Sequence, residues 1–424
     1  MSELESPEIP STPHAGPVQI AHVPRISMQA FCETSELASL ISEAADDRRM
    51  DKAHVKVHMG GAPAAIEAYR TAPTPNLILL EAGHDRAKLH ADLDELSQFC
   101  DSGTKVIVVG RANDISLYRE LMSRGISEYL VMPFSVLDFV RHVSMLYNGD
   151  GAEPLGRVLA FVGAKGGVGS STIAHNVAWS IAREHQIQTV IVDMDLAYGT
   201  AGLDFNQDPP QGIADAVFAP ERLDANMIDR LLSKCSDHLS MLAASATLDR
   251  VYDFEENAFD IVFDFLRESV PCIVLDVPHV WTSWSKRVLT SADDVVVVAT
   301  PDLANLRNAK GLLDVLRAAR PNDHKPRLVL NNVGMLKRPE IELGDFASAV
   351  EAEPIGVIPF DAKLFGTATN NGQMIAEVDA ASKTTEILAD IGRIIMGRAE
   401  VKKTKKSLPL LDPIMSRFIK RKAS

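Results

Sequence analysis

A glycine-rich stretch at residues 163–172 carries the clearest chemical signal in this 424-residue chain. Its residues are Gly163, Ala164, Lys165, Gly166, Gly167, Val168, Gly169, Ser170, Ser171 and Thr172. Glycines let a backbone curl until successive N–H groups face inward and can bind phosphate. An apolar strand pattern precedes the stretch and a helical pattern follows it, so the positive end of a helix dipole adds to this site. A hydroxyl at Ser171 or Thr172 can bind Mg²⁺. The alternative is a strand–helix turn without a ligand.

Two further apolar segments end in carboxylates. Residues 190–192 lead into Asp193 and Asp195, and the alternation of side chains along a strand places both on one side. Residues 273–275 lead into Asp276. Ligands of open α/β sheets bind at the carboxyl ends of the strands, so we expect these acids near the phosphate loop. The alternative is that they cap the turns that follow.

The stretch at 163–172 resembles the deviant P-loop of the MinD/ParA family of ATPases, whose pattern is K-G-G-x-G-K-[ST]. This resemblance implies binding of ATP with Mg²⁺. Lys165 matches the signature lysine, which in relatives reaches across a dimer to the partner's nucleotide. Ser170 replaces the second lysine, so one charge-assisted phosphate contact of roughly 1.5–3 kcal/mol is lost. We expect binding to persist and hydrolysis to be weak or absent, because charge matters most where it develops in the transition state.

The same resemblance implies roles for the other polar residues. Ser171 would bind Mg²⁺, Asp193 would support its water, and Asp276 would hold the ion through water. Asp195 matches the residue that helps to position the attacking water, so Lys165 and Asp195 are the candidate catalytic residues.

Later segments resemble the base-binding motifs of the family, in the expected order. Asn331, within residues 328–332, matches the asparagine that binds the adenine ring. Pro359 lies in residues 355–361, which resemble the family's "G-x-I-P-x-D" segment beside the base.

The segment after Asp276 departs from the family pattern. Small residues are usual there, whereas this chain has His279, Trp281 and Trp284. We expect both indoles to lie in the core. The alternative is an exposed surface for a partner.

Alternating strand and helix patterns predict two three-layer α/β domains with mainly parallel sheets. The predicted fold class is a flavodoxin-like receiver fold followed by a P-loop NTPase fold of MinD/ParA type. The predicted boundaries are a disordered leader at 1–24, a receiver-like domain at 25–148, a linker at 149–156, the ATPase domain at 157–397 and a basic tail at 398–424.

The first domain resembles a response-regulator receiver that has lost its phosphorylation chemistry. Residues 129–134 look like the receiver's "Y-L-x-K-P-F", but Met132 stands at the lysine position. The third strand ends in Glu81 instead of a phosphoacceptor Asp, and only Glu33 remains near the first strand. Aspartyl phosphorylation is therefore not expected. We expect the domain to serve docking or dimerisation; the alternative is a plain scaffold.

A receiver-like domain followed by a MinD-like domain with this Lys-to-Ser change resembles the CpaE/TadZ proteins of type IV (Tad/Flp) pilus assembly. Residues 195–204, D-L-A-Y-G-T-A-G-L-D, are similar to a segment typical of that group. The resemblance implies a nucleotide-sandwich homodimer that helps to place pilus secretion machinery. It also implies a cytoplasmic protein that lies peripherally at the inner membrane or a cell pole.

Composition fits a cytoplasmic globular protein. The chain is 46% hydrophobic and 24% charged, no stretch approaches the ~18–20 apolar residues of a membrane span, and the acidic N-terminus is not a secretory signal. The four cysteines lie far apart, which favours reduced thiols. The net charge of −14 makes DNA an unlikely partner.

The C-terminal tail is basic. Residues 398–424 hold nine Lys or Arg and two acids. Asp412 is a predicted N-cap and Pro413 a first helical residue, and apolar residues recur at helical spacing over 411–418. This pattern predicts a short amphipathic helix for anionic lipid or an acidic partner. The alternative is a disordered solubilising tail.

The leading prediction is therefore an ATP-binding, dimeric localisation factor for pilus assembly with weak or absent hydrolysis. One alternative is a non-catalytic scaffold or adaptor in which nucleotide is structural. Another is a DNA-partition or flagellar-placement ATPase, which the acidic body of the chain disfavours.

Overall fold

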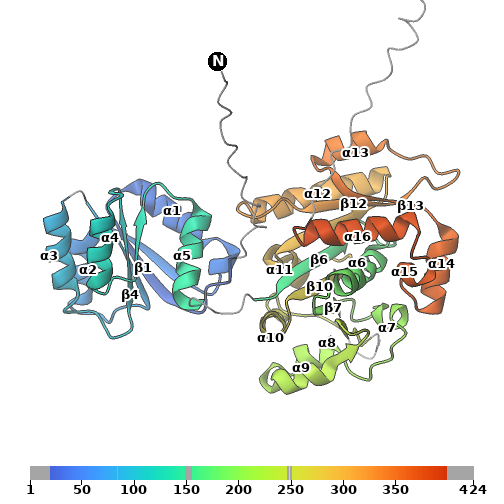
Figure 1. Ribbon diagram of the computed structural model, residues 1–424, viewed down its shortest axis with the longest axis horizontal. Helices are drawn as coiled ribbons and strands as arrows, with labels where there is room; N and C mark the ends of the chain where they lie inside the picture. Colours follow the sequence, from blue (N-terminus) through green and yellow to red (C-terminus); the bar gives the residue numbers. More distant parts are fainter. Residues whose placement is uncertain (1–19, 84, 149–154, 246–247, 249–250, 399–424) are drawn as a thin grey trace, which may run out of the picture.

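The computed structural model describes residues 20–83, 85–148, 155–245, 248 and 251–398. They form two α/β domains that lie side by side (Figure 1). The predicted fold class is confirmed. The predicted tail helix lies outside the described residues, as do nearly all of the leader and most of the linker.

The first domain is a five-stranded parallel sheet in the order β2-β1-β3-β4-β5, which is a flavodoxin-like order. Buried clusters on both faces of the sheet give three layers. The strands are β1 (Ser27–Cys32), β2 (His54–Met59), β3 (Leu77–Glu81), β4 (Lys105–Gly110) and β5 (Glu128–Val131). The helices are α1 (Ser35–Ala45), the 3-10 helix η1 (Arg48–Met50), α2 (Gly61–Tyr69), α3 (Arg86–Leu96), α4 (Ile115–Ser123) and α5 (Val136–Asn148).

The second domain is an eight-stranded sheet in the order β13-β12-β11-β6-β10-β7-β9-β8. Only the β8–β9 pair is antiparallel among these strands. Central strands such as β10 are buried at every residue because helices cover both faces, which explains why their sequences are almost entirely apolar. The strands are β6 (Arg157–Gly163), β7 (Thr189–Asp193), β8 (Leu232–Lys234), β9 (Leu239–Leu242), β10 (Cys272–Val277), β11 (Asp294–Ala299), β12 (Arg327–Val333) and β13 (Pro354–Pro359).

Helices cover the two faces of this sheet in separate groups (Figure 1). One face carries α6 (Ser170–His185), α7 (Ala201–Asp204), α14 (Ala362–Asn371), α15 (Ile375–Val378) and α16 (Lys383–Ile395). The other carries α8 (Ile213–Phe218), α9 (Ala225–Leu231), α10 (Asp260–Ser269), α11 (Ser283–Ser291), α12 (Leu303–Ala319) and α13 (Leu343–Val350), with the 3-10 helix η2 (Pro220–Arg222) after α8. None of the helices in the described part of the chain has the length and apolar character needed to cross a membrane.

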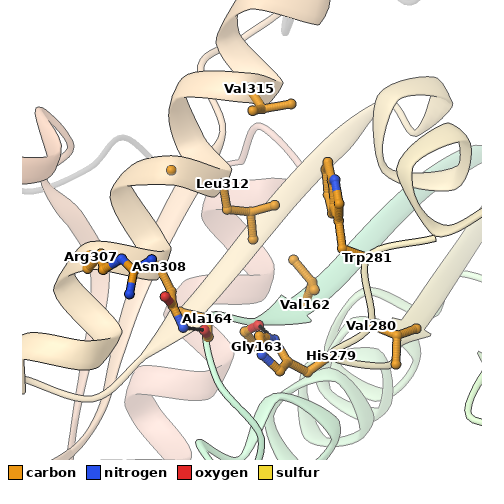
Figure 2. A pocket seen from close by; sticks show the side chains of 11 residues that line it. Val162, Gly163, Ala164, His279, Val280, Trp281, Arg307, Asn308, Leu312 and Val315 are labelled. Carbon is orange, nitrogen blue, oxygen red and sulfur yellow. Dashed lines mark hydrogen bonds between the residues drawn. The ribbon is translucent and has the colours of Figure 1, made fainter. Parts of the chain in front are cut away.

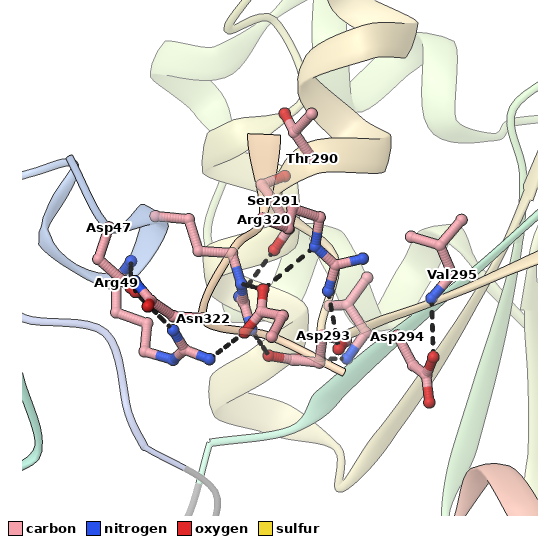
Figure 3. Close-up of polar contacts among 12 residues, drawn as sticks. Asp47, Arg49, Thr290, Ser291, Asp293, Asp294, Val295, Arg320 and Asn322 are labelled. Carbon is pink, nitrogen blue, oxygen red and sulfur yellow. Dashed lines mark hydrogen bonds and ion pairs between the residues drawn. The ribbon is translucent and has the colours of Figure 1, made fainter. Parts of the chain in front are cut away.

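An ionic cluster joins the two domains (Figure 3). Arg48, on η1, places Nε 2.6 Å from Asp323 Oδ2 and Nη2 3.0 Å from Asp293 Oδ1. Arg49 also pairs with Asp323. Asp293 Oδ2 accepts a 2.8 Å hydrogen bond from the Val158 backbone N–H near the start of β6. The receiver-like domain is therefore docked at the amino ends of β6 and β11, the edge of the sheet opposite the phosphate loop.

Candidate functional site

The loop between β6 and α6 has the shape of a phosphate-binding loop. Gly167 and Gly169 have φ angles of +80° and +87°, a region that residues with side chains rarely adopt. A Cβ at Gly169 would also lie 2.6 Å from Asn331 Nδ2. Helix α6 begins at Ser170 without a side-chain cap. Its first N–H groups are therefore left for a ligand or water.

The side chains of this loop differ in their exposure. Lys165 is exposed and forms no ion pair within the described residues, so it can reach a ligand or a second molecule. Ser170, Ser171 and Thr172 are half-buried in the first turn of α6. Ser170 brings no charge to the loop, so the groups that it could offer to a phosphate are backbone amides, hydroxyls and Lys165.

Asn331 supports the loop directly. It is 3% exposed on β12, and its Nδ2 donates a 2.8 Å hydrogen bond to the Val168 carbonyl. Its Oδ1 is buried and has no hydrogen-bond partner within the described residues. This unpaired acceptor fits the amino group of an adenine, which is the role expected for Asn331. Pro359, the other expected base contact, ends the neighbouring strand β13 and pairs in register with Val333 of β12.

The predicted carboxylates meet at the carboxyl ends of adjacent strands. Asp193 on β7 and Asp276 on β10 are register partners, and both are buried. Asp193 accepts backbone hydrogen bonds from Asp195 (3.1 Å) and Ala201 (3.0 Å), so it also holds the loop after β7. Burial and the nearby Asp276 raise the pKa of Asp193 to about 7. Burial raises the pKa of Asp195, which is half-buried and accepts a hydrogen bond from the Tyr198 backbone.

The donor set suits a magnesium ion that arrives with a nucleotide. Within the described ranges, no group of three or more His, Cys, Asp or Glu residues could hold a metal by itself. Mg²⁺ at phosphate sites usually takes one or two protein groups, waters and the phosphates. Ser171 and Asp276 would hold the ion here, and Asp193 would lie behind them.

His175 is a residue of this site that we did not predict. It lies in α6, fully buried, with Nδ1 2.7 Å from Asp204 Oδ2 and Nε2 3.5 Å from Asp276 Oδ2. Burial alone would lower the pKa of His175, but the two carboxylates raise it to about 10. The only signal in the sequence was a histidine within an otherwise apolar helix face.

A cavity of about 450 Å³ opens beside the phosphate loop (Figure 2). Its walls come from the end of β6, the segment after β10, and α12. His279 contacts the Gly163 carbonyl through Nδ1 at 2.8 Å. Trp281 is 54% exposed at this cavity, whereas Trp284 is buried against Phe259. The expectation that both indoles lie in the core is confirmed for Trp284 and wrong for Trp281, which precedes α11 and lines an open cavity.

At the position where a receiver has its phosphoacceptor, the receiver-like domain has a buried acid whose carboxylate is hydrogen-bonded. Glu81 ends β3 and is buried. Its carboxylate accepts backbone hydrogen bonds from Glu33 (2.6 Å) and Thr34 (2.8 Å), and a third from the Thr34 hydroxyl (2.7 Å). Thr34 is the N-cap of α1. Glu81 therefore ties β3 to the start of α1.

A glycine loop between a buried strand and a helix, with acids at the adjacent strand ends, defines a P-loop nucleotide-binding domain of MinD/ParA type. A family model described as an AAA domain matches residues 156–328. A solved ParA family ATPase from Chlorobium tepidum is 25% identical over 56% of this chain and 98% of its own, with a TM-score of 0.51. The septum site-determining protein MinD of Helicobacter pylori is 29% identical over 238 residues, which are 53% of this chain and 85% of MinD.

The receiver-like domain is similar to a different group of solved proteins. The solved pilus assembly protein CpaE from Caulobacter crescentus is 50% identical over 30% of this chain and 97% of its own, with a TM-score of 0.30. The proteins similar to this chain thus include a CpaE pilus assembly protein over the receiver-like region and MinD/ParA ATPases over the second domain.

Proposed function

We propose that this protein is an ATP-binding localisation factor for pilus assembly that works as a nucleotide-controlled homodimer. The observation that carries the nucleotide part is the loop at 163–172, with an uncapped helix start and the unpaired Asn331 Oδ1 beside it. The pilus part is supported by the 50% identity of the receiver-like domain to the Caulobacter protein, which is described as a pilus assembly protein.

Each predicted residue has a place in this proposal. The amides of residues 163–172 bind the phosphates, while Ser171 and Asp276 hold Mg²⁺, which supplies the positive charge that Ser170 does not. Asn331 and Pro359 bind the base. Because hydrolysis then depends on Asp195 without the usual lysine, turnover is slow or absent.

In this proposal, Lys165 joins two subunits by reaching the nucleotide of the partner. The test is titration calorimetry with Mg-ATP together with analytical ultracentrifugation. Wild-type protein should bind and dimerise, and Lys165→Ala should bind more weakly and remain monomeric. Lys325→Ala, an exposed lysine before β12 at the opposite edge, is the matched control. Absence of heat from wild-type protein would refute nucleotide binding, and dimerisation of Lys165→Ala would refute the lysine's role.

Asp195→Ala separates this switch from a scaffold with structural nucleotide. If hydrolysis resets the switch, the variant keeps the ATP-bound dimer for longer than wild-type protein does. An unchanged dimer lifetime, with pilus assembly intact, would favour the scaffold.

We further propose that the protein is cytoplasmic and acts peripherally at the inner membrane or a cell pole, where it contacts pilus machinery. The basic tail would add affinity for anionic lipid, and dimerisation would double the number of tails. Flotation with anionic and neutral vesicles, with and without residues 399–424, tests this. Salt-sensitive binding to non-specific DNA would instead favour a partition ATPase.

A further inference from the structure

Four acids gather where β7 and β10 end. They are Asp193, Asp195, Asp204 and Asp276. Within the described residues, the one basic side chain in ion-pair contact with any of them is His175. The mechanism proposed above does not use this histidine.

The geometry of His175 gives it two distinct partners. Nδ1 lies 2.7 Å from Asp204 Oδ2, a normal hydrogen bond to a carboxylate, which can only accept. Nε2 faces Asp276 Oδ2 at 3.5 Å and has no hydrogen-bond partner within the described residues. This distance exceeds that of a normal N–H···O bond, so Nε2 lies beside the Asp276 carboxylate without a hydrogen bond to it.

His175 also reaches the loop that Asp193 holds. Asp193 binds the backbone N–H of Ala201 at the start of α7, and Asp204 ends the same helix. The loop after β7 is thus fixed by Asp193 at one point and by His175 at another. His175 connects this loop with Asp276, the acid expected to face the magnesium ion.

We propose that His175 is a positioning residue for the Mg-nucleotide site. It orients the Asp276 carboxylate through Nε2 and anchors that contact to α7 through Nδ1. Groups that hydrogen-bond to metal-binding acids fix their orientation, and their loss typically weakens metal binding 10- to 100-fold. The inference rests on the proposed nucleotide binding.

The test compares nucleotide affinity in saturating Mg²⁺ with affinity in EDTA, using a fluorescent ATP analogue and the full chain. In His175→Leu, we expect the Mg²⁺-dependent gain in affinity to fall about 10- to 100-fold, as for other groups behind metal ligands. The affinity in EDTA should stay within about twofold, because the phosphate loop itself is intact. His175→Gln, whose amide can donate to one carboxylate, should recover part of the gain. His185→Gln, near the end of the same helix, is the matched control and should behave as wild-type protein.

Equal losses with and without Mg²⁺, or no loss, would overturn the proposal, because a merely structural histidine affects both conditions alike. If His175→Leu does not fold, His175→Gln and Asp204→Asn test the proposal in its place. Both should lower the Mg²⁺-dependent gain in nucleotide affinity and leave the affinity in EDTA unchanged. Failure of wild-type protein to bind the analogue in either condition would instead refute the proposed function.

Discussion

Replacing Arg48 by alanine should undock the receiver-like domain from the ATPase domain. The Arg48 side chain is only 12% exposed and forms ion pairs with Asp293 and Asp323 across the interface. It also donates to the Ser291 carbonyl at 3.0 Å. All three contacts join the domains, so their loss weakens docking and leaves the core of each domain intact.

The docking free energy lost in Arg48→Ala depends on the ion pairs that remain after the substitution. Each charge-assisted contact contributes roughly 1.5–3 kcal/mol. Asp293 keeps Arg267 at 3.0 Å, and Asp323 keeps Arg320 at 3.1 Å, so neither carboxylate is left unpaired. We therefore expect the low end of the ~3–5 kcal/mol range for breaking a buried pair. A loss of about 3 kcal/mol shifts the docking equilibrium about 100-fold.

Small-angle X-ray scattering and hydrogen exchange of residues 47–51 would measure this loss. The matched control is Arg70→Ala, because Arg70 is 51% exposed and pairs with Glu67 and Glu95 inside the receiver-like domain. Exposed pairs contribute about 0–1 kcal/mol, so the control should stay docked. If Arg48→Ala gives the radius of gyration and the exchange of the control, the assignment of docking to this cluster is wrong.

Three further predictions concern single residues. Gly169→Ala should lower Mg-ATP affinity at least tenfold in calorimetry, since the left-handed backbone alone costs about 1–3 kcal/mol and the new Cβ would strike Asn331; Gly344→Ala, with open space around it, is the control and should change nothing. Burial and two nearby arginines lower the pKa of His22 to about 3. The contribution of neutral His22 to the free energy of unfolding is therefore complete above about pH 6.5 and is lost as the pH falls toward 3. Urea unfolding should show this loss, at most about 1.4 kcal/mol per pH unit, and His22→Gln should flatten it; equal slopes would contradict the assignment. Ser170→Lys should raise the rate of phosphate release from ATP at least tenfold by restoring the missing charge-assisted contact. An unchanged rate would show that Ser170 is not the cause of slow hydrolysis.

Strands with almost entirely apolar sequences were predictable, and weakly patterned elements were not. The central strands β10 and β11 are buried at every residue, so composition alone indicated them. β8 has three residues, is only partly buried, and pairs at the edge of the sheet, so no periodicity marked it. Helix α3 begins at Arg86, where Asp85 caps its first turn, although its buried leucines begin only at Leu89.

The site was predictable as far as it depends on strand ends. Asp193 and Asp276 lie side by side because β7 and β10 are neighbours in a parallel sheet. His175 could not be predicted, since its partners come from α7 and β10 and only the folded chain brings them together. The support that Asn331 gives to Val168 is likewise a contact between distant segments.

The two ends of β6 have different roles in the molecule. Its start is bound by Asp293, which also holds the receiver-like domain, and its end carries the phosphate loop. Because β6 is paired with β10 and β11 along its length, it transmits little movement between these ends. Nucleotide-dependent change is therefore expected in the loops after β7 and β10, where Tyr198 and Trp281 are exposed. On this reasoning, we expect the receiver-like domain to stay docked when nucleotide binds, and we expect any partner that senses the nucleotide to bind at the opposite edge of the sheet.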